Sequence, residues 1–175
     1  MTKWLSHRMV ERGIIKEEEQ ELYQFGIRNG MILLLNVVTA LVIGLLTEQL
    51  AVVAVFTLSF MVLRSYTGGY HSDSRIFCYL GSNLVLLVPV YTQAVFYKTS
   101  LARLLAVLLV SAGIIFLLSP MHSKNRKLDK EEQKHFGRKA RLIAALELVV
   151  LGILWHAGQI PYAYAVYTGI CITAL

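Results

Sequence analysis

Long stretches without a single charged side chain constrain this chain more than any other feature of its sequence. Five of them follow one another, over residues 29–47, 49–63, 76–97, 104–123 and 148–175. About 20 consecutive apolar residues span a bilayer as a helix, so these stretches predict an all-α integral membrane protein. Composition agrees, because only 16% of the residues are charged, against about 25% in soluble domains. An ordinary soluble enzyme, a disordered chain and a disulfide scaffold are therefore excluded.

Polar and turn-forming residues divide these stretches into about six predicted transmembrane helices. The predicted spans are approximately 29–47, 49–63, 76–97, 101–121, 142–157 and 160–175, with a tight turn at Glu48 and Gln49. The N-terminal segment 1–28 mixes apolar and basic residues at the spacing of a helical stripe, which predicts one or two amphipathic helices in the headgroup region. We expect a single polytopic domain, with three spans in 29–97 and three in 98–175.

The distribution of lysine and arginine predicts the orientation of these spans in the bilayer. Five of these residues lie in 1–28, two in 64–75 and eight in 124–141, which six spans place on one side. Only Lys98 and Arg103 lie on the other side, and the positive side of a membrane protein is the cytoplasmic one. The N-terminus, a loop over 64–78 and a basic loop over 119–141 are therefore expected in the cytoplasm. This topology accounts for the net charge of +6 without a nucleic-acid partner.

The loop over 64–78 holds residue types that suit nucleophilic catalysis by a thiol. Cys78 is a candidate nucleophile, and His71 is a candidate base for it. A helix that begins just before Cys78, capped by one of residues 72–74, would favour the thiolate through its amide dipoles. Gly68 and Gly69 allow a sharp backbone turn before His71. On these residues alone, a surface histidine and a cysteine that packs in a helix remain an alternative.

The whole pattern, Arg-x3-Gly-Gly-x-His-x6-Cys, resembles that of the accessory gene regulator protein B (AgrB) family. Members of that family are membrane-embedded cysteine endopeptidases of bacterial peptide quorum sensing. The resemblance implies that His71 and Cys78 form the catalytic pair, and that Arg64, Gly68 and Gly69 support it. It implies a multi-pass protein of the bacterial cell membrane without metal or organic cofactor. A third catalytic residue stays open, with Asp73 and Asn83 in reach by sequence.

The substrate implied by this resemblance is an AgrD-type pro-peptide. Its C-terminal tail would be cleaved at the cytoplasmic face through an acyl-thioester, which leads to a cyclic thiolactone or lactone peptide. Lys124, Arg126 and Lys127 would then bind an acidic tail, although the basic loop can equally serve only to fix topology and contact anionic lipid. We expect a homodimer, because short spans leave little room to enclose a peptide. A small transporter or exporter, or a non-catalytic membrane partner, are the rival functions.

Three other groups are candidates for a metal site, a reactive thiol or a functional carboxylate, and each has a simpler interpretation. Glu131 and His135 resemble part of a metalloprotease motif, but they are expected in a solvated loop without further ligands, so no metal is predicted. Cys171 lies in the last span without a charged neighbour and is expected to be an inert packing thiol. Glu147 is expected either to pair with Arg141 at the inner interface or to face the active site.

Overall fold

The computed structural model describes residues 2–68, 75–121 and 129–175 of the chain. Its helices are α1 (Thr2–Glu11), a 3-10 turn (Glu17–Glu19), α2 (Gln20–Leu46), α3 (Leu50–Thr67), α4 (Arg75–Tyr91), α5 (Gln93–Lys98), α6 (Leu101–Leu118), α7 (Lys130–His156) and α8 (Ile160–Thr173). The described ranges contain no strand, and a single isolated bridge joins Gly68 to Met121. The all-α prediction is confirmed. Contacts divide the chain into two compact units, Met1–Thr39 and Ala40–Leu175.

Within the described ranges, three helices are long and apolar enough to cross a bilayer. They are α2 with the turn that precedes it (Glu17–Leu46), α3 and α6, and they contain most of the predicted spans 29–47, 49–63 and 101–121. The predicted turn at Glu48 and Gln49 is confirmed, because the amide of Gln49 donates to the carbonyl of Gly44 there. The other predicted spans are helical too, in α4 with α5, in α7 and in α8.

The span predicted over 76–97 is divided into two helices. Helix α4 ends at Tyr91 and α5 begins at Gln93, with Thr92 between them. Pro89 lacks the amide hydrogen that would continue the ladder. Its carbonyl oxygen instead accepts a hydrogen bond of 2.9 Å from the Tyr164 hydroxyl, which also lies 2.7 Å from the hydroxyl of Thr92. A side chain of α8 therefore stabilises the break.

Both predicted functional loops are shorter than the sequence indicated. Residues 130–141 of the predicted basic loop form the first turns of α7 rather than a solvated loop. Lysine, glutamate, glutamine and arginine are good helix formers, and Glu131 and Glu132 complement the helix dipole in the first turn. In the predicted loop 64–78, residues 64–67 end α3 and residues 75–78 begin α4.

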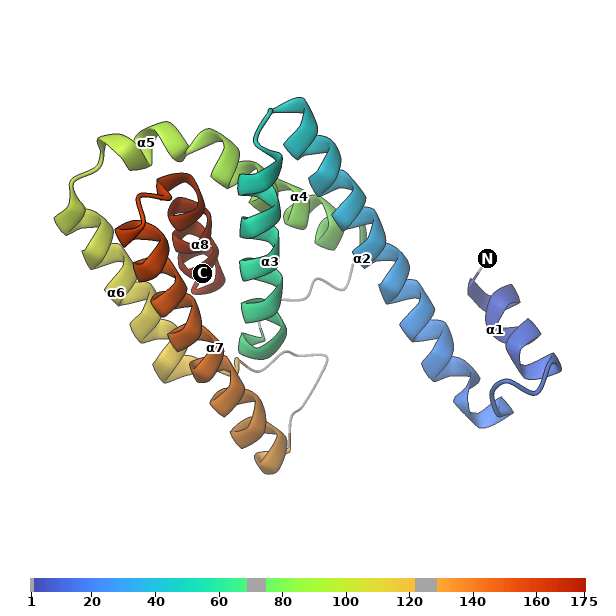
Figure 1. Ribbon diagram of the computed structural model, residues 1–175. Coiled ribbons are helices and arrows are strands. Elements are labelled where there is room, and N and C mark those ends of the chain that lie inside the picture. Colours follow the sequence, from blue (N-terminus) through green and yellow to red (C-terminus); the bar gives the residue numbers. More distant parts are fainter. Residues whose placement is uncertain (1, 69–74, 122–128) are drawn as a thin grey trace. The chain divides into compact units, whose positions relative to one another are not determined.

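Helix α8 is the centre of the unit Ala40–Leu175. It contacts α3, α6 and α7, and Figure 1 shows it enclosed by them. Its buried residues are Ala163, Tyr164, Ala165, Val166, Thr168, Gly169, Ile170 and Thr173. Several of them are small, which lets neighbouring helices approach closely: a Cβ on Gly169 would lie 2.6 Å from the Ser59 hydroxyl of α3. This close packing of α8 fixes α3 and α7 around it.

The unit Met1–Thr39 consists of α1, the 3-10 turn and most of α2. In α1, the Arg8 guanidinium lies 5.2 Å from the ring centroid of Trp4, and Glu11 pairs with His7 and Arg8. Apolar side chains such as Trp4 and Ile14 are exposed on this unit. The N-terminal segment thus contains a helix in which the basic Arg8 contacts the apolar Trp4, while its position in the headgroup region stays a prediction.

Candidate active site

The C-terminal ends of α3 and α6 are joined backbone to backbone. The amide of Met121 donates a hydrogen bond of 2.8 Å to the carbonyl of Thr67. Gly68 follows with φ of +72°, and a Cβ there would lie 2.6 Å from the Met121 carbonyl oxygen. Only glycine avoids both the backbone strain and this clash. We call this contact between Thr67, Gly68 and Met121 the α3–α6 junction.

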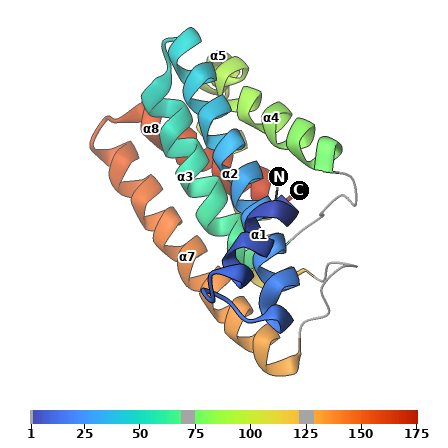
Figure 2. The same cartoon turned by 90° about the vertical axis from the view of Figure 1, so that its right-hand side faces the viewer.

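Helix α7 packs across the same end of the bundle. A Cβ on Gly137 would lie 3.1 Å from Pro120 Cδ, so α7 passes close to the segment that precedes Met121. The Tyr66 ring lies 6.2 Å from the Phe136 ring, and the Lys139 ammonium lies 5.6 Å from the Tyr66 centroid. Figures 1 and 2 show the first turns of α7 projecting beyond the other helices of this unit. The three helices thus form one basic end of the bundle.

Most of the predicted site residues belong to the two segments that begin at the α3–α6 junction. Gly69 and His71 lie in 69–74, which follows Gly68, and three predicted tail-binding residues lie in 122–128, which follows Met121. Those three are Lys124, Arg126 and Lys127. All five residues lie outside the described residues. The structure therefore brings together the starting points of both segments, and no feature of the sequence had indicated this pairing.

Cys78 and Arg64 lie on the two helices that flank the first of these segments. Cys78 is the fourth residue of α4, so the predicted start of a helix just before it is confirmed. The amides of a first helical turn have no partners within the helix and carry a partial positive charge. Arg64 lies in the last turn of α3 and is half-buried. The distance between His71 and Cys78 depends on residues outside the described ranges.

The sequence did not predict a polar contact that lies in the middle of the bundle. The Ser59 hydroxyl of α3 donates a hydrogen bond of 3.0 Å to Glu147 Oε2 of α7. The expected pairing of Glu147 with Arg141 is wrong, because Arg141 Nε donates to the carbonyl of Phe116 at 3.0 Å. A lone serine in an apolar helix carries no signal of a partner 88 residues away. Glu147 thus links α7 to α3 and does not pair with Arg141 at the inner membrane interface.

Cys171 is half-buried on α8. It borders an apolar cavity between α6 and α8 that is lined by Val107, Val110 and Ile114, among others. Ser111 lines the same cavity. Asn83, a candidate third catalytic residue, donates its side-chain amide to the carbonyl of Tyr79 in its own helix. Among the described residues, no three His, Cys, Asp or Glu side chains are grouped to hold a metal.

Comparison with known proteins now decides the family. The family model of Accessory gene regulator B matches residues 1–175. The chain belongs to the AgrB family. The resemblance that the sequence showed between Arg64 and Cys78 is confirmed, and family membership links the chain to the membrane and to pro-peptide processing in quorum sensing.

Two relatives of the AgrB-family chain come from Clostridium perfringens. The "Putative AgrB-like protein" of strain SM101 / Type A is 23% identical over 148 residues, which are 81% of this chain and 69% of that protein. The "Putative AgrB-like protein 2" of strain 13 / Type A is 25% identical over 134 residues, which are 71% of this chain and 61% of that protein. The chain thus spans about two thirds of the length of these relatives. No solved structure matches it.

Proposed function

We propose that this chain is a membrane-embedded cysteine endopeptidase that cleaves the C-terminal tail of an AgrD-type pro-peptide. The α3–α6 junction is the observation that carries the proposal. His71 stands three residues after Gly68, and Lys124 stands three residues after Met121. Three residues reach at most about 11 Å, so these short distances along the chain would allow the proposed base and the proposed tail-binding segment to act on one peptide. Cys78 begins the next helix along the chain.

The proposed reaction proceeds through a thioester on Cys78. His71 accepts the thiol proton, and the thiolate attacks the carbonyl carbon of the scissile peptide bond. The carbon–nitrogen bond breaks as the imidazolium returns its proton to the leaving amine, which departs with the acidic tail. A thiol or hydroxyl of the peptide then gives its proton to His71 and attacks the thioester carbonyl, which closes the ring as the bond to Cys78 breaks and the Cys78 thiolate leaves; the imidazolium finally returns the proton to this thiolate. No external oxidant, reductant or metal is needed for this balance.

In the proposed function, the basic segment 122–128 recognises the acidic tail of the pro-peptide. Lys124, Arg126 and Lys127 would attract carboxylates through charge, and Lys139 adds a described cation beside Tyr66 at the same end. Arg64, Gly68 and Gly69 would shape the backbone around His71. This arrangement pairs cations with an anionic leaving segment.

The proposed membrane arrangement has six spans, formed by α2, α3, α4 with α5, α6, α7 and α8. Segment 1–28 would lie in the cytoplasmic interface, and the junction would face the cytoplasm, as the distribution of lysine and arginine favours. A homodimer is part of the proposal, because α2 buries only Ala40 and Gly44 in this chain. Labelling of a single cysteine in 124–141 by an impermeant reagent from outside intact cells would contradict this orientation.

The contact between Ser59 and Glu147 is the one observation that favours a transporter instead. Ionisable groups inside a membrane bundle often mark ion or substrate paths. Here, however, Ser59 also lies against Gly169, so the carboxyl group stands at a tightly packed helix crossing. We therefore assign it to packing and keep transport as the rival function.

Mass spectrometry of the purified protein in nanodiscs tests the peptidase proposal. Incubation with pro-peptide should yield a covalent adduct on Cys78 that neutral hydroxylamine releases, as expected for a thioester. Cys171→Ser is the matched control, since it removes the other cysteine and should form the same adduct. Normal tail cleavage by a Cys78→Ala protein would reject the peptidase and return the chain to the transporter or partner class. An adduct on Cys171 would retain the reaction and move the site.

A further inference from the structure

An open pocket lies on the surface of α1, in the unit Met1–Thr39. It has a volume of about 360 Å³, and volumes of about 300–1,000 Å³ are typical of ligand sites. Four apolar side chains and two guanidinium groups line it: Trp4, Leu5, Arg8, Met9, Arg12 and Ile14. We call this space the α1 pocket. The proposed peptidase reaction does not use it.

The two guanidinium groups of the α1 pocket follow one another along one side of the helix. The amide of Arg12 donates to the carbonyl of Arg8 at 3.1 Å, so the helical spacing continues to Arg12. Side chains four residues apart on a helix are neighbours, and like charges at this spacing repel each other. An anion bound between the two groups would remove this repulsion.

Both guanidinium groups are exposed and keep donors for an anionic ligand. Glu11 approaches Nε of Arg8 at 4.0 Å, which engages one of the five N–H groups of that side chain. Among the described residues, no carboxylate pairs with Arg12, and none of the glutamates in 17–21 lines the pocket. A guanidinium can hold two phosphate oxygens through parallel N–H donors. The pocket therefore suits a phosphate group.

The apolar side chains of the α1 pocket are exposed as well. Trp4 is 60% exposed and Ile14 is 63% exposed. Ser6, about half a turn from Trp4 and Arg8 and hence on the opposite face of the helix, is buried. The Arg8 guanidinium lies 5.2 Å from the centroid of the Trp4 ring, so the apolar and the cationic parts of the pocket adjoin. A soluble anion would leave this apolar surface in water, whereas a lipid would cover it.

The connection from α1 to the next helix favours a lipid as the ligand. Only residues 12–16 separate α1 from Glu17–Leu46, which is long and apolar enough to cross a bilayer. Five residues reach at most about 18 Å, so the α1 pocket stays near the surface of that bilayer. Tryptophan is enriched where hydrocarbon meets the headgroup region.

We infer that the α1 pocket binds the headgroup of an anionic phospholipid, with its phosphate between Arg8 and Arg12 and its hydrocarbon against Trp4 and Ile14. The sequence predicted only that segment 1–28 lies in the headgroup region, and this inference adds a lipid class and the residues that select it. It rests on the proposed location of that segment and not on the peptidase reaction.

Quenching of Trp4 fluorescence by a brominated lipid tests the inference. The full chain is placed in nanodiscs of phosphatidylcholine, a constant part of which carries bromine in its acyl chains, with or without phosphatidylglycerol. The chain has two tryptophans, so the signal that Trp4→Phe removes is that of Trp4. We expect phosphatidylglycerol to increase quenching of Trp4 by about twofold or more, because each cation near an anionic lipid strengthens binding about fivefold.

Variants of the two arginines show whether their charge causes this increase. Arg8→Gln with Arg12→Gln should abolish it, whereas Arg8→Lys with Arg12→Lys, which keeps both charges, should retain most of it. The matched control is Lys134→Gln with Arg138→Gln, which removes two exposed cations from α7 and should preserve the full increase. An equal loss in the glutamine and lysine pairs at positions 8 and 12 would attribute the increase to the fold of α1 and overturn the inference.

Two further outcomes would overturn the inference. One is equal quenching of Trp4 with and without phosphatidylglycerol. The other is an equally large change in Trp4 fluorescence when inorganic phosphate or an acidic peptide is added to nanodiscs of phosphatidylcholine alone, which would assign the α1 pocket to a soluble anion. The measurement involves no pro-peptide and no cleavage, so its failure would leave the peptidase proposal in place.

Discussion

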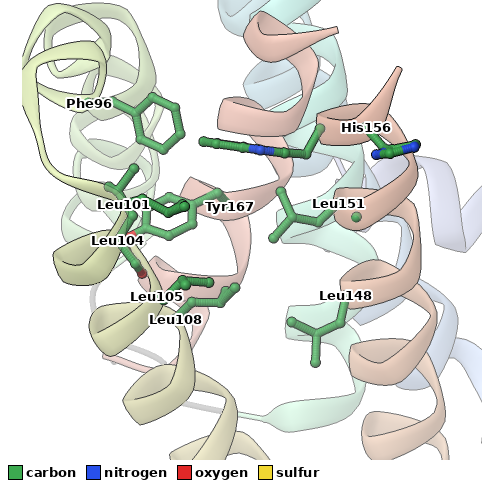
Figure 3. A pocket seen from close by; sticks show the side chains of 11 residues that line it. Phe96, Leu101, Leu104, Leu105, Leu108, Leu148, Leu151, His156 and Tyr167 are labelled. Atoms are coloured by element: carbon green, nitrogen blue, oxygen red, sulfur yellow. Dashed lines mark hydrogen bonds between the residues drawn. The ribbon is translucent and has the colours of Figure 1, made fainter. Parts of the chain in front are cut away.

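The two ends of the unit Ala40–Leu175 are held together in different ways. At the α3–α6 junction, the contacts are made by backbone atoms and glycines, with basic side chains around them. At the other end, they are made by aromatic rings, such as those of Phe96 and Trp155, and by leucines of α6 and α7 that line an apolar cleft, which we call the aromatic cleft (Figure 3). Backbone hydrogen bonds fix where a segment begins, whereas bulky side chains hold helices together and tolerate a cavity. We expect the reaction at the junction for this reason, since catalytic geometry requires fixed positions.

Among the substitutions considered at the two ends, replacing the proposed nucleophile Cys78 should cause the largest loss of tail cleavage. Cys78→Ala should abolish tail cleavage, and Cys78→Ser should be nearly inactive, because a hydroxyl ionises far less readily than a thiol. His71→Ala should also be inactive. Chromatography with mass detection of the released tail measures each rate. Cys171→Ser should cleave at the rate of the unaltered chain, and a loss of cleavage in this variant would place the reaction elsewhere in the bundle.

The two glycines with φ of +72° provide the sharpest test of the comparison. Gly68→Ala should destabilise the protein because φ of +72° with ψ of −159° is a backbone conformation that essentially only glycine adopts, which costs about 1–3 kcal/mol. The clash with the Met121 carbonyl costs about 1–3 kcal/mol more. Gly158→Ala also places an alanine at φ of +72° but has no neighbour within 4 Å, so it lacks the cost of the clash. Thermal unfolding in detergent and kcat/KM for the pro-peptide measure both. Equal losses in the two variants would show that the junction contact contributes nothing.

The charge of the basic segment should affect substrate binding more than turnover. Replacing Lys124, Arg126 and Lys127 by glutamine should raise KM by about threefold to a hundredfold, because exposed ion pairs contribute about 0.2–1 kcal/mol each. The salt dependence of KM should weaken at the same time, while kcat stays similar. Lys98→Gln with Arg103→Gln, at the two cations that the predicted topology leaves on the opposite side of the membrane, should leave KM unchanged. Unaltered kinetics with normal membrane insertion would leave the basic segment with a role in topology alone.

The contact between Ser59 and Glu147, midway between the two ends, should give the smallest effect. Ser59→Ala removes the donor to a half-buried carboxyl group and should lower the free energy of unfolding by about 1 kcal/mol. Ser65→Ala is the control, since Ser65 is exposed and its hydroxyl donates to the carbonyl of Met61 in its own helix. Unfolding by heat in detergent measures the difference. A large loss of cleavage by Ser59→Ala with unchanged stability would connect Glu147 to the reaction.

Local chemistry in the sequence determined the class of the protein and its candidate residues. Charge-free stretches of bilayer length predicted the helices, because an apolar backbone in lipid has to satisfy its own hydrogen bonds. The spacing from Arg64 to Cys78 indicated the family, and the turn chemistry before Cys78 predicted where α4 begins. The first turns of α7 were missed, since a run of lysine, arginine and glutamate is compatible with a helix and with a solvated loop alike.

Only the tertiary structure decided which distant residues meet. The bond between Thr67 and Met121, the contact of Ser59 with Glu147 and Gly169, and the cleft beside Phe96 each join segments far apart in the chain. Serines, glycines and leucines of these kinds occur throughout apolar helices, so their spacing carries no information about partners. Helix packing selects the partners, because close contact depends on the shapes of two faces at once. The sequence thus determined which helices form, and packing around α8 decided which residues stand together at each end.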